Sequence, residues 1–435
     1  MKIVGQAIML GAWMTALINV TCDENVTLTC SLGDKVYTAY APKGSHQFKV
    51  HQLGAWTITA IDGEWRKSTE VLVYDDKQEV DVELYLANVY GISRVYNASS
   101  PVWARTDDAV GKTATSSDYT VAGASDFDTA MPWAGIQREI LSTGDVMVKI
   151  PKFYYQRYRE GDIEYIKIAD RKRNGFTLHP LFNHNGVESD CAYVGAYKTS
   201  SDNKSVTGVL PQVSQTRATM RANAKSKGAG WGIIDISAVS AIQMLILVEF
   251  ATNDSQTAIG WGACNNRYSA QTLGTCDNVP NLTGAPSGSN GVRDVVWRGI
   301  EGFWGNVYEW TDGINCQGGF YYVCNDPSKY ADDTSTGYVQ LTYTKAISST
   351  SDYILSVGLD TGENNHIMLP WGVGGSSSTG YCDGCSAYTG NTWYAYARGG
   401  SWTGGKLIGL FTSDAGSGSA VKDERYGSRL LYIPQ

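Results

Sequence analysis

Short segments with alternating apolar and polar residues fill the first part of the chain and restrict its fold more than any other feature. They follow one another between residues 15 and 87, separated by turn signals such as DEN, PKGS and DGE. Alternation with a period of two places apolar side chains on one face of a strand, and closely spaced turns join antiparallel neighbours. We therefore expect a small β-sandwich over residues 1–87. The expected strands are ALINVTC, VTLTCS, KVYTAYA, HQFKVH, AWTITAID, STEVLVYD and EVDVELYLA.

The rest of the chain is long enough for at least one more domain, because 435 residues exceed one ordinary core. Residues 88–135 have little periodicity and many small polar residues, which indicates a connecting segment. From residue 136 onward we expect a second domain that extends to residue 435. It opens with a β-meander over residues 138–171, in which TGD and EGD form turns and Pro151 lies at an edge or a strand start.

Two helices are expected in this second domain. The first extends from about Ser214 to Lys227 and ends before Gly228, a residue suited to a helix C-terminus. The second begins near Asp235 or Ser237, either of which could cap it, and its apolar run AVSAIQMLILVEFAT indicates a buried helix too short to span a membrane. Strands and helices that follow one another in this way predict an α+β protein.

Charge and hydropathy exclude several classes of partner. The formal net charge is −8, whereas a nucleic acid or an anionic membrane would need a basic surface. The first twenty residues imitate a secretory signal, but Gln6 and several glycines interrupt the apolar run, so we favour a first strand over a signal or anchor. We therefore expect no nucleic-acid partner and no membrane insertion.

Neither the cysteines nor the histidines form a recognisable metal site. The nine cysteines are an odd number, and Cys382 and Cys385 form a lone C-x-x-C. Buried thiols are the simplest interpretation, with a Cys22–Cys30 pair across a hairpin as an alternative. The five histidines are scattered, and no G-x-S-x-G, Walker or H-E-x-x-H motif occurs. We expect no metal and no cofactor.

The region from residue 391 to residue 432 interleaves aromatic and charged residues with glycines. Tyrosine outnumbers phenylalanine by 27 to 9 in the whole chain, and rigid aromatic side chains bury much area at low entropic cost when a ligand binds. The same aromatic residues would also suit a core, and composition leaves both interpretations open. An earlier motif, RGIEGFWGNVYEW at 298–310, contains Glu301 and Glu309, for which hydrogen bonding inside the fold is favoured over acid–base chemistry.

Three motifs carry a resemblance when they are taken in order: GNVYEW at 305–310, RGGSW at 398–402 and YGSRLLY at 426–432. Together they resemble the formylglycine-generating-enzyme-like branch of the C-type lectin fold. Within this branch the chain looks most like phage tail-tip proteins and the variable proteins of diversity-generating retroelements, the major-tropism-determinant-like family. The resemblance covers about residues 90–435 and implies two helices and twisted antiparallel strands. The segment AWTITAIDGEWRKSTEVLVYD similarly resembles immunoglobulin-like or carboxypeptidase-regulatory-like modules.

The resemblance also implies a division of the C-terminal region into a fixed framework and a displayed, ligand-binding set. The framework residues would be Trp304, Gly305, Asn306, Trp310, Arg398, Gly399, Gly400, Ser401 and Arg429. The displayed residues would be Trp393, Tyr394, Tyr396, Trp402, Thr403, Lys406, Ser413, Lys422, Asp423, Glu424 and Arg425.

The expected function is adhesion. Oxidases of this fold bind copper through a cysteine pair after the RGGS motif, and this chain has no cysteine there, so we expect no catalytic residues. The resemblance implies a receptor-binding protein at the tail tip of a phage or prophage virion, made in the bacterial cytoplasm, with a retroelement-diversified face. Its partners would be a bacterial surface protein or glycan and phage tail or baseplate proteins, with a homotrimer as an open alternative. A secreted or cell-surface adhesin of the same fold is the second hypothesis, and a formylglycine-generating-type oxidase the third.

Overall fold

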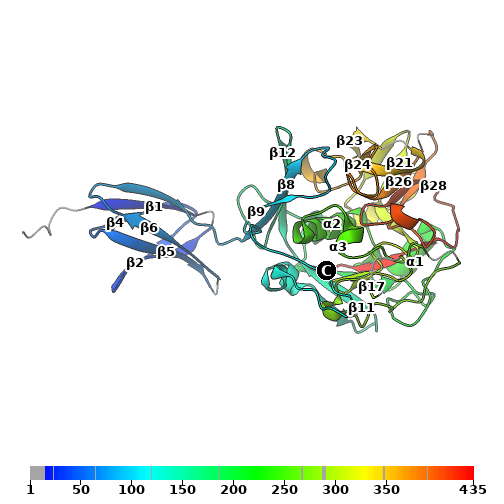
Figure 1. Ribbon diagram of the computed structural model, residues 1–435, viewed down its shortest axis with the longest axis horizontal. Helices are drawn as coiled ribbons and strands as arrows, with labels where there is room; N and C mark the ends of the chain where they lie inside the picture. Colours follow the sequence, from blue (N-terminus) through cyan, green and yellow to red (C-terminus); the bar gives the residue numbers. More distant parts are fainter. Residues whose placement is uncertain are drawn as a thin grey trace, which may run out of the picture. The chain divides into compact units, whose positions relative to one another are not determined.

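The chain forms two compact units, one made of Met1–Asn88 with Arg171–Phe176 and the other of Val89–Asp170 with Thr177–Gln435 (Figure 1). The computed structural model describes residues 15–22, 24–63, 65–118, 120–184, 186–265, 268–286, 291–345, 348–388 and 390–435, without the side chains of residues 348–351. The alternatives of a first strand or a signal concern residues 1–20, of which 1–14 lie outside the described residues and 16–20 belong to the first strand.

The first unit is built from the strands that the alternating pattern predicts. They form two sheets, with the orders β4-β1-β7 and β3-β2-β5-β6. Apolar residues of both sheets, among them Ile18, Leu28 and the fully buried Trp56, share one core. The strands are β1 (Ala16–Cys22), β2 (Val26–Leu32), β3 (Lys35–Ala41), β4 (Gly44–Val50), β5 (Gly54–Asp62), β6 (Trp65–Val73) and β7 (Glu79–Glu83).

The strand order of this unit differs from that of an immunoglobulin constant domain. There the first strand lies beside the second. Here β1 pairs antiparallel with β4 and parallel with β7, while β2 lies in the other sheet beside β3 and β5. The segment Arg171–Phe176 completes the unit, because Arg171 contacts Glu24 at 2.9 Å and Asp62 at 2.8 Å.

The region expected to be a connection, residues 88–135, contributes strands to the second unit. β8 pairs with β13 over its whole length, and its Tyr90 and Ile92 are buried in the core. The sheet has the order β14-β12-β13-β8-β9. Its strands are β8 (Val89–Val95), β9 (Ala104–Asp107), β12 (Tyr154–Glu160), β13 (Ile163–Ala169) and β14 (Thr177–Leu178).

The expected meander is divided between two sheets. β12 and β13 belong to the sheet just described, whereas β10 and β11 belong to a sheet of order β10-β11-β17-β30-β18. Pro151 is the last residue of β11, an inner strand, so its expected place at an edge or a strand start is corrected. The strands of this sheet are β10 (Gln137–Ile140), β11 (Val146–Pro151), β17 (Cys191–Lys198), β18 (Trp231–Ile233) and β30 (Arg429–Tyr432).

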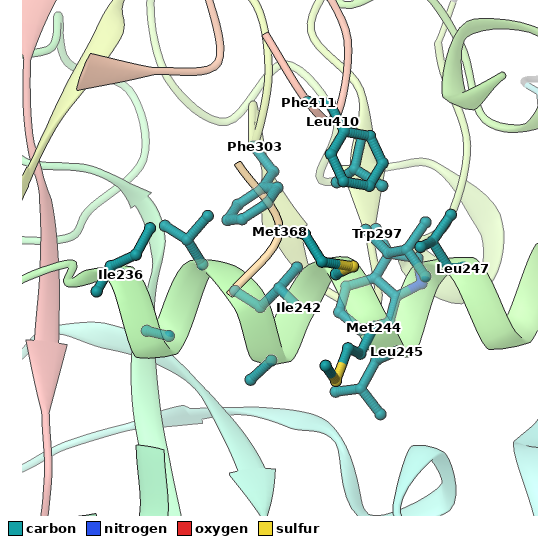
Figure 2. Packing of buried hydrophobic residues seen from close by; sticks show 14 of the residues in the cluster. Ile236, Ile242, Met244, Leu245, Leu247, Trp297, Phe303, Met368, Leu410 and Phe411 are labelled. Carbon is teal, nitrogen blue, oxygen red and sulfur yellow. The ribbon is translucent and has the colours of Figure 1, made fainter. Parts of the chain in front are cut away.

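Both predicted helices are confirmed. α1 (Arg217–Lys225) is capped by Thr216, and α2 (Ile236–Phe250) is capped by Asp235, whose side chain accepts a hydrogen bond from the amide of Ala238. α2 contacts β8 and β13 as well as β21 of the largest sheet, and nearly all of its residues are buried. Figure 2 shows its Ile242, Met244 and Leu247 packed among residues from distant segments. The α+β prediction therefore holds at a coarse level, with β-structure predominating.

The largest sheet carries the C-terminal region and lies toward the yellow and orange part of the second unit in Figure 1. Its order is β23-β22-β21-β27-β28-β26-β24-β25, and β29 pairs with β21. Its strands are β21 (Tyr308–Gln317), β22 (Phe320–Val323), β23 (Val339–Thr344), β24 (Ser348–Val357), β25 (Pro370–Val373), β26 (Gly384–Ala387), β27 (Tyr394–Arg398), β28 (Ser413–Ser417) and β29 (Tyr426–Gly427).

Short elements complete the second unit. The short strands are β15 (Asn183–His184), β16 (Val187–Glu188), β19 (Val296–Trp297) and β20 (Ile300–Glu301). The short helices are α3 (Ser255–Ala258), η1 (Asp126–Thr129), η2 (Trp133–Gly135), η3 (Pro180–Phe182), η4 (Pro280–Leu282), η5 (Pro327–Lys329), η6 (Gly362–Asn364) and η7 (Gly405–Leu407).

Candidate functional site

Three motifs that lie far apart in the sequence meet at one buried carboxylate, Glu309 of β21. Its Oε2 accepts a hydrogen bond from Arg398 Nη1 at 2.9 Å, and its Oε1 accepts from Arg429 Nε at 2.9 Å and from Lys198 Nζ at 2.8 Å. All four side chains are at most 1% exposed. We call these four residues the Glu309 cluster. It joins GNVYEW, RGGSW and YGSRLLY to β17 inside the fold.

The cluster depends on electrostatic balance. Burial by itself would raise the pKa of Glu309, but the charges of Arg429, Lys198 and Arg398 outweigh burial and lower this pKa from 4.5 to about 2. Burial lowers the pKa of Lys198 from 10.5 to about 8, although Glu309 favours its charged form. Removal of one partner would leave the others buried without compensation, which is strongly destabilising. The cluster therefore holds the C-terminal segments to the core.

Glu301, the other carboxylate in the segment 298–310, also forms its hydrogen bonds inside the fold. Glu301 accepts hydrogen bonds from the amides of Gly274 at 2.6 Å and Cys276 at 2.8 Å. Burial, aided by the neighbouring charge of Asp294, raises the pKa of Glu301 from 4.5 to about 7. The expected hydrogen-bonding role of Glu301 and Glu309 is thus confirmed.

The framework motifs also contact one another through their backbones. The amide of Gly305 donates to the carbonyl of Gly399 at 2.7 Å, and the amide of Trp402 donates to the carbonyl of Asn306 at 3.0 Å. A Cβ atom on Gly400 would lie 2.1 Å from Cδ1 of Ile408, so only glycine fits there. All nine predicted framework residues are buried: Trp304, Gly305, Asn306, Trp310, Arg398, Gly399, Gly400, Ser401 and Arg429.

The predicted displayed set is only partly at the surface. Residues of this set that are exposed or half-buried are Trp393, Tyr394, Thr403, Lys406, Lys422, Asp423, Glu424 and Arg425. Tyr396, Trp402 and Ser413 are instead 2–3% exposed, and their predicted display is wrong. The reason for Tyr396 is that β27 is covered on both faces: Ala395 and Ala397 pack into one apolar cluster and Tyr396 into another.

Two pairs of aromatic residues lie near the start of β27, where part of this set is exposed. The ring centroids of Trp393 and Tyr322 lie 5.3 Å apart, and those of Tyr394 and Tyr388 lie 6.2 Å apart. Tyr388 is 44% exposed, and the other three rings are half-buried. We call Tyr322, Tyr388, Trp393 and Tyr394 the aromatic surface. Its side chains come from β22, from β27 and from the segments between β26 and β27.

A buried cation lies beneath the aromatic surface. Lys345 is 1% exposed, its Nζ lies 5.2 Å from the ring centroid of Tyr394, and it donates a hydrogen bond to the carbonyl of Tyr388 at 2.6 Å. Burial lowers the pKa of Lys345. The ring of Tyr388 can pack closely against Gly416 because glycine has no Cβ atom. A Cβ atom there would lie 2.2 Å from Cδ2 of Tyr388. The rings of Tyr388 and Tyr394 are therefore positioned by these contacts as well as by the sheet.

Sequence reasoning missed Tyr322, Tyr388 and Lys345. For Tyr322 a signal existed, because alternation in FYYV places Tyr321 inside and Tyr322 outside, as observed. No local pattern in the sequence marks Tyr388 or Lys345, because pairing between distant strands brings each of them to the aromatic surface.

The remaining displayed residues have other neighbours. Arg425 pairs with Asp423 at 2.9 Å, and its carbonyl accepts a hydrogen bond from the amide of Tyr308, which ties this loop to β21. Lys406 Nζ lies 5.5 Å from the ring centroid of Trp261. The displayed residues were expected to form a single face. Those that are exposed instead form separate groups, each with its own neighbours.

The cysteines and histidines are placed mainly in the interior. None of the nine cysteines, all of which are described, forms a disulfide, so Cys22 and Cys30 are not joined, and all but Cys191 are buried. Burial raises the pKa of Cys382 and of Cys385 to about 12. Within the described ranges, no group of three or more His, Cys, Asp or Glu side chains is arranged to hold a metal ion.

Neither protein-family models nor curated proteins match this chain. In the part of the chain that the structure describes, none of the helices has the length and apolar character of a membrane span.

Proposed function

We propose that this chain is a non-enzymatic receptor-binding protein of a phage or prophage tail tip. The observation that carries the proposal is the aromatic surface, which consists of the ring pairs Tyr322–Trp393 and Tyr388–Tyr394. The second pair is held by the buried Lys345. Interfaces are enriched in rigid Tyr and Trp side chains, because these bury a large area when a partner binds and lose little side-chain entropy. The ligand is a bacterial surface protein or glycan.

The framework supports this proposal. The Glu309 cluster joins the three motifs that resemble the C-type lectin fold, and its residues are buried away from any external ligand. Such a framework tolerates changes at exposed positions, because its stability comes from contacts that those positions do not make. A retroelement-diversified binding face needs this separation between stability and recognition.

Binding is favoured over catalysis by the state of the motif carboxylates. Glu301 and Glu309 are held by hydrogen bonds inside the fold, and the region after Arg398 contains no cysteine. A catalytic acid or base has to reach its substrate within hydrogen-bond distance. The chain would therefore act by adhesion, attached to the virion tail tip and its baseplate proteins.

The first unit would serve as the mount. Of the two sandwich types that the sequence suggests, its strand order departs from the immunoglobulin constant arrangement, so we favour the carboxypeptidase-regulatory-like type. Several copies attached to one virion, for example as a homotrimer, would multiply weak contacts through a high effective concentration.

The proposal is tested by adsorption of the labelled full chain to a panel of bacterial isolates. For any isolate that binds, the double variant Trp393→Ala, Tyr394→Ala should lower the affinity by a factor of about 10 or more, since truncation of central aromatic residues typically costs at least 2 kcal/mol. Treatment of the cells with protease or with periodate then distinguishes a protein receptor from a glycan.

The matched control is Trp371→Ala. Trp371 is also aromatic and 40% exposed, but it lies on β25 at the other edge of the same sheet. The control should adsorb like the unmodified chain. If the double variant remains folded and adsorbs as well as the control, the aromatic surface does not bind the receptor.

A further inference from the structure

A separate cavity lies beside α1, β18 and β30 in the second unit, with a volume of about 540 Å³. This is within the range of cavities that hold small molecules, roughly 300–1,000 Å³. It shares no residue with the aromatic surface. Any ligand of this cavity is therefore distinct from the receptor proposed above.

The walls of the cavity are largely apolar. β18 and β30 pair in register and supply Trp231, Ile233 and Leu431, while Ile433 and Pro327 close the sides. An apolar group that enters this space would be removed from water, which favours binding in proportion to the area buried. The body of a fitting ligand is therefore apolar.

A buried ring nitrogen in the lining has no hydrogen-bond partner among the described residues. His184 is 8% exposed and lines the cavity, and its Nε2 lies 3.1 Å from the carbonyl oxygen of Leu181. Because a carbonyl oxygen only accepts, Nε2 carries the proton and Nδ1 is left as an acceptor. No hydrogen-bond partner of Nδ1 is present in the described residues. A buried acceptor without a donor is unfavourable, so this position favours a ligand that donates.

A buried carboxylate in the same lining favours a cationic donor. Asp235 is fully buried and accepts hydrogen bonds from the amide of Ala238 at 2.8 Å and the hydroxyl of Tyr330 at 3.0 Å. Asp312 beside it pairs with Arg221 through both oxygens, whereas no described lysine or arginine pairs with Asp235. Burial accordingly raises the pKa of Asp235. A ligand cation would compensate its charge.

The other basic groups near the cavity are already engaged. Lys225 lines it, but its Nζ donates to the carbonyl of Pro327 at 3.0 Å. The guanidinium of Arg221 is held by Asp312 and Asp332. Neither cation is therefore available to Asp235, and a ligand donor can pair with Asp235 and His184 in a lining that also contains Ser328 and Gln435.

We propose that this cavity binds a small primary amine with an apolar body, whose ammonium group donates hydrogen bonds to His184 Nδ1 and Asp235. The probe is 2-phenylethylamine, with 2-phenylethanol and 3-phenylpropionate as a neutral and an anionic comparator of similar size. Binding to the full chain is measured by saturation-transfer NMR and calorimetry. The amine should bind at least tenfold more tightly than either comparator.

Two variants keep the test independent of folding defects. Asp235→Asn keeps one oxygen that accepts from the amide of Ala238, its new amide group would donate to the hydroxyl of Tyr330, and the charge is removed. This variant should weaken amine binding at least tenfold. Gly232→Leu should abolish binding by filling the cavity, because Gly232 lines it and a Cβ atom there meets no atom within 4 Å. Gly418→Leu is the control, since Gly418 has equally open space and lies outside the cavity.

Four results would overturn the proposal: no binding of the amine to the full chain, equal binding of a comparator, unchanged amine binding by folded Gly232→Leu, or unchanged amine binding by folded Asp235→Asn. Loss of amine binding in Gly232→Leu and in Asp235→Asn, with retention in Gly418→Leu, would support it.

Discussion

Replacement of Glu309 by glutamine should destabilise the second unit in a pH-dependent manner. Glutamine keeps the shape of the side chain but leaves Lys198, Arg398 and Arg429 buried without a counter-charge. Breaking a buried ion cluster in this way costs about 3–5 kcal/mol. The pKa of Glu309 gives an independent value, because a fall from 4.5 to about 2 corresponds to about 3 kcal/mol of stability at neutral pH.

The sign of the pH dependence follows from the lowered pKa. The contribution of Glu309 is complete above its unfolded pKa of 4.5 and is lost as pH falls toward about 2. The difference in unfolding free energy between the unmodified chain and Glu309→Gln should therefore shrink by about 2 kcal/mol between pH 7 and pH 3. Asp294 and Glu301, whose pKa values are raised, titrate in both proteins and largely cancel in this difference.

The assay is urea unfolding followed by tryptophan fluorescence at several pH values. Most tryptophans lie in the second unit, so its transition dominates the signal. Glu160→Gln, at an exposed position at the end of β12, is the control and should change stability by less than about 0.5 kcal/mol. A difference for Glu309→Gln that does not vary between pH 7 and pH 3 would refute the electrostatic reasoning.

Three further outcomes follow from burial and packing. Trp402→Ala should lower the free energy of unfolding in urea by about 3–5 kcal/mol, because this side chain is 3% exposed and its removal leaves a cavity. A loss below about 1 kcal/mol would instead indicate that Trp402 lies at the surface. Gly416→Ala should cost about 1–3 kcal/mol, since the added Cβ would overlap the ring of Tyr388, whereas Gly418→Ala, which meets open space, should be nearly neutral. Cys316, whose pKa is raised to about 12 by burial, should resist iodoacetamide at pH 8 and react in urea, as followed by mass spectrometry; equal rates would contradict its burial.

The sequence predicted elements whose signals are local. The alternating segments became β1 to β7, and the alternation of buried and half-buried residues is clearest in β1, β2 and β5. α2 was recognisable from its apolar run and the Asp235 cap. Non-local pairing explains the failures. β8 appeared irregular, yet it is a strand because its partner β13 lies about seventy residues further along the chain. Tyr396 was predicted to be displayed because the sequence does not indicate that both faces of β27 are covered.

The candidate site was predictable only where motifs marked it. GNVYEW, RGGSW and YGSRLLY pointed to a framework, but the convergence of Arg398 and Arg429 on Glu309 joins residues 89 and 120 positions apart. Lys198 came from a segment without a marked polar motif. The aromatic surface and the cavity beside α1, β18 and β30 are likewise assembled from separate strands, so neither could be predicted from one segment.

The separation of framework from displayed residues is tested most directly by a substitution library sorted for folding. Single positions of the full chain are randomised, and protease-resistant variants are counted by sequencing. We predict that most substitutions are accepted at Trp393, Tyr394 and Glu424 and that most are rejected at Glu309 and Arg398. Equal tolerance at the two sets of positions would contradict the proposed division between a fixed framework and a variable binding surface.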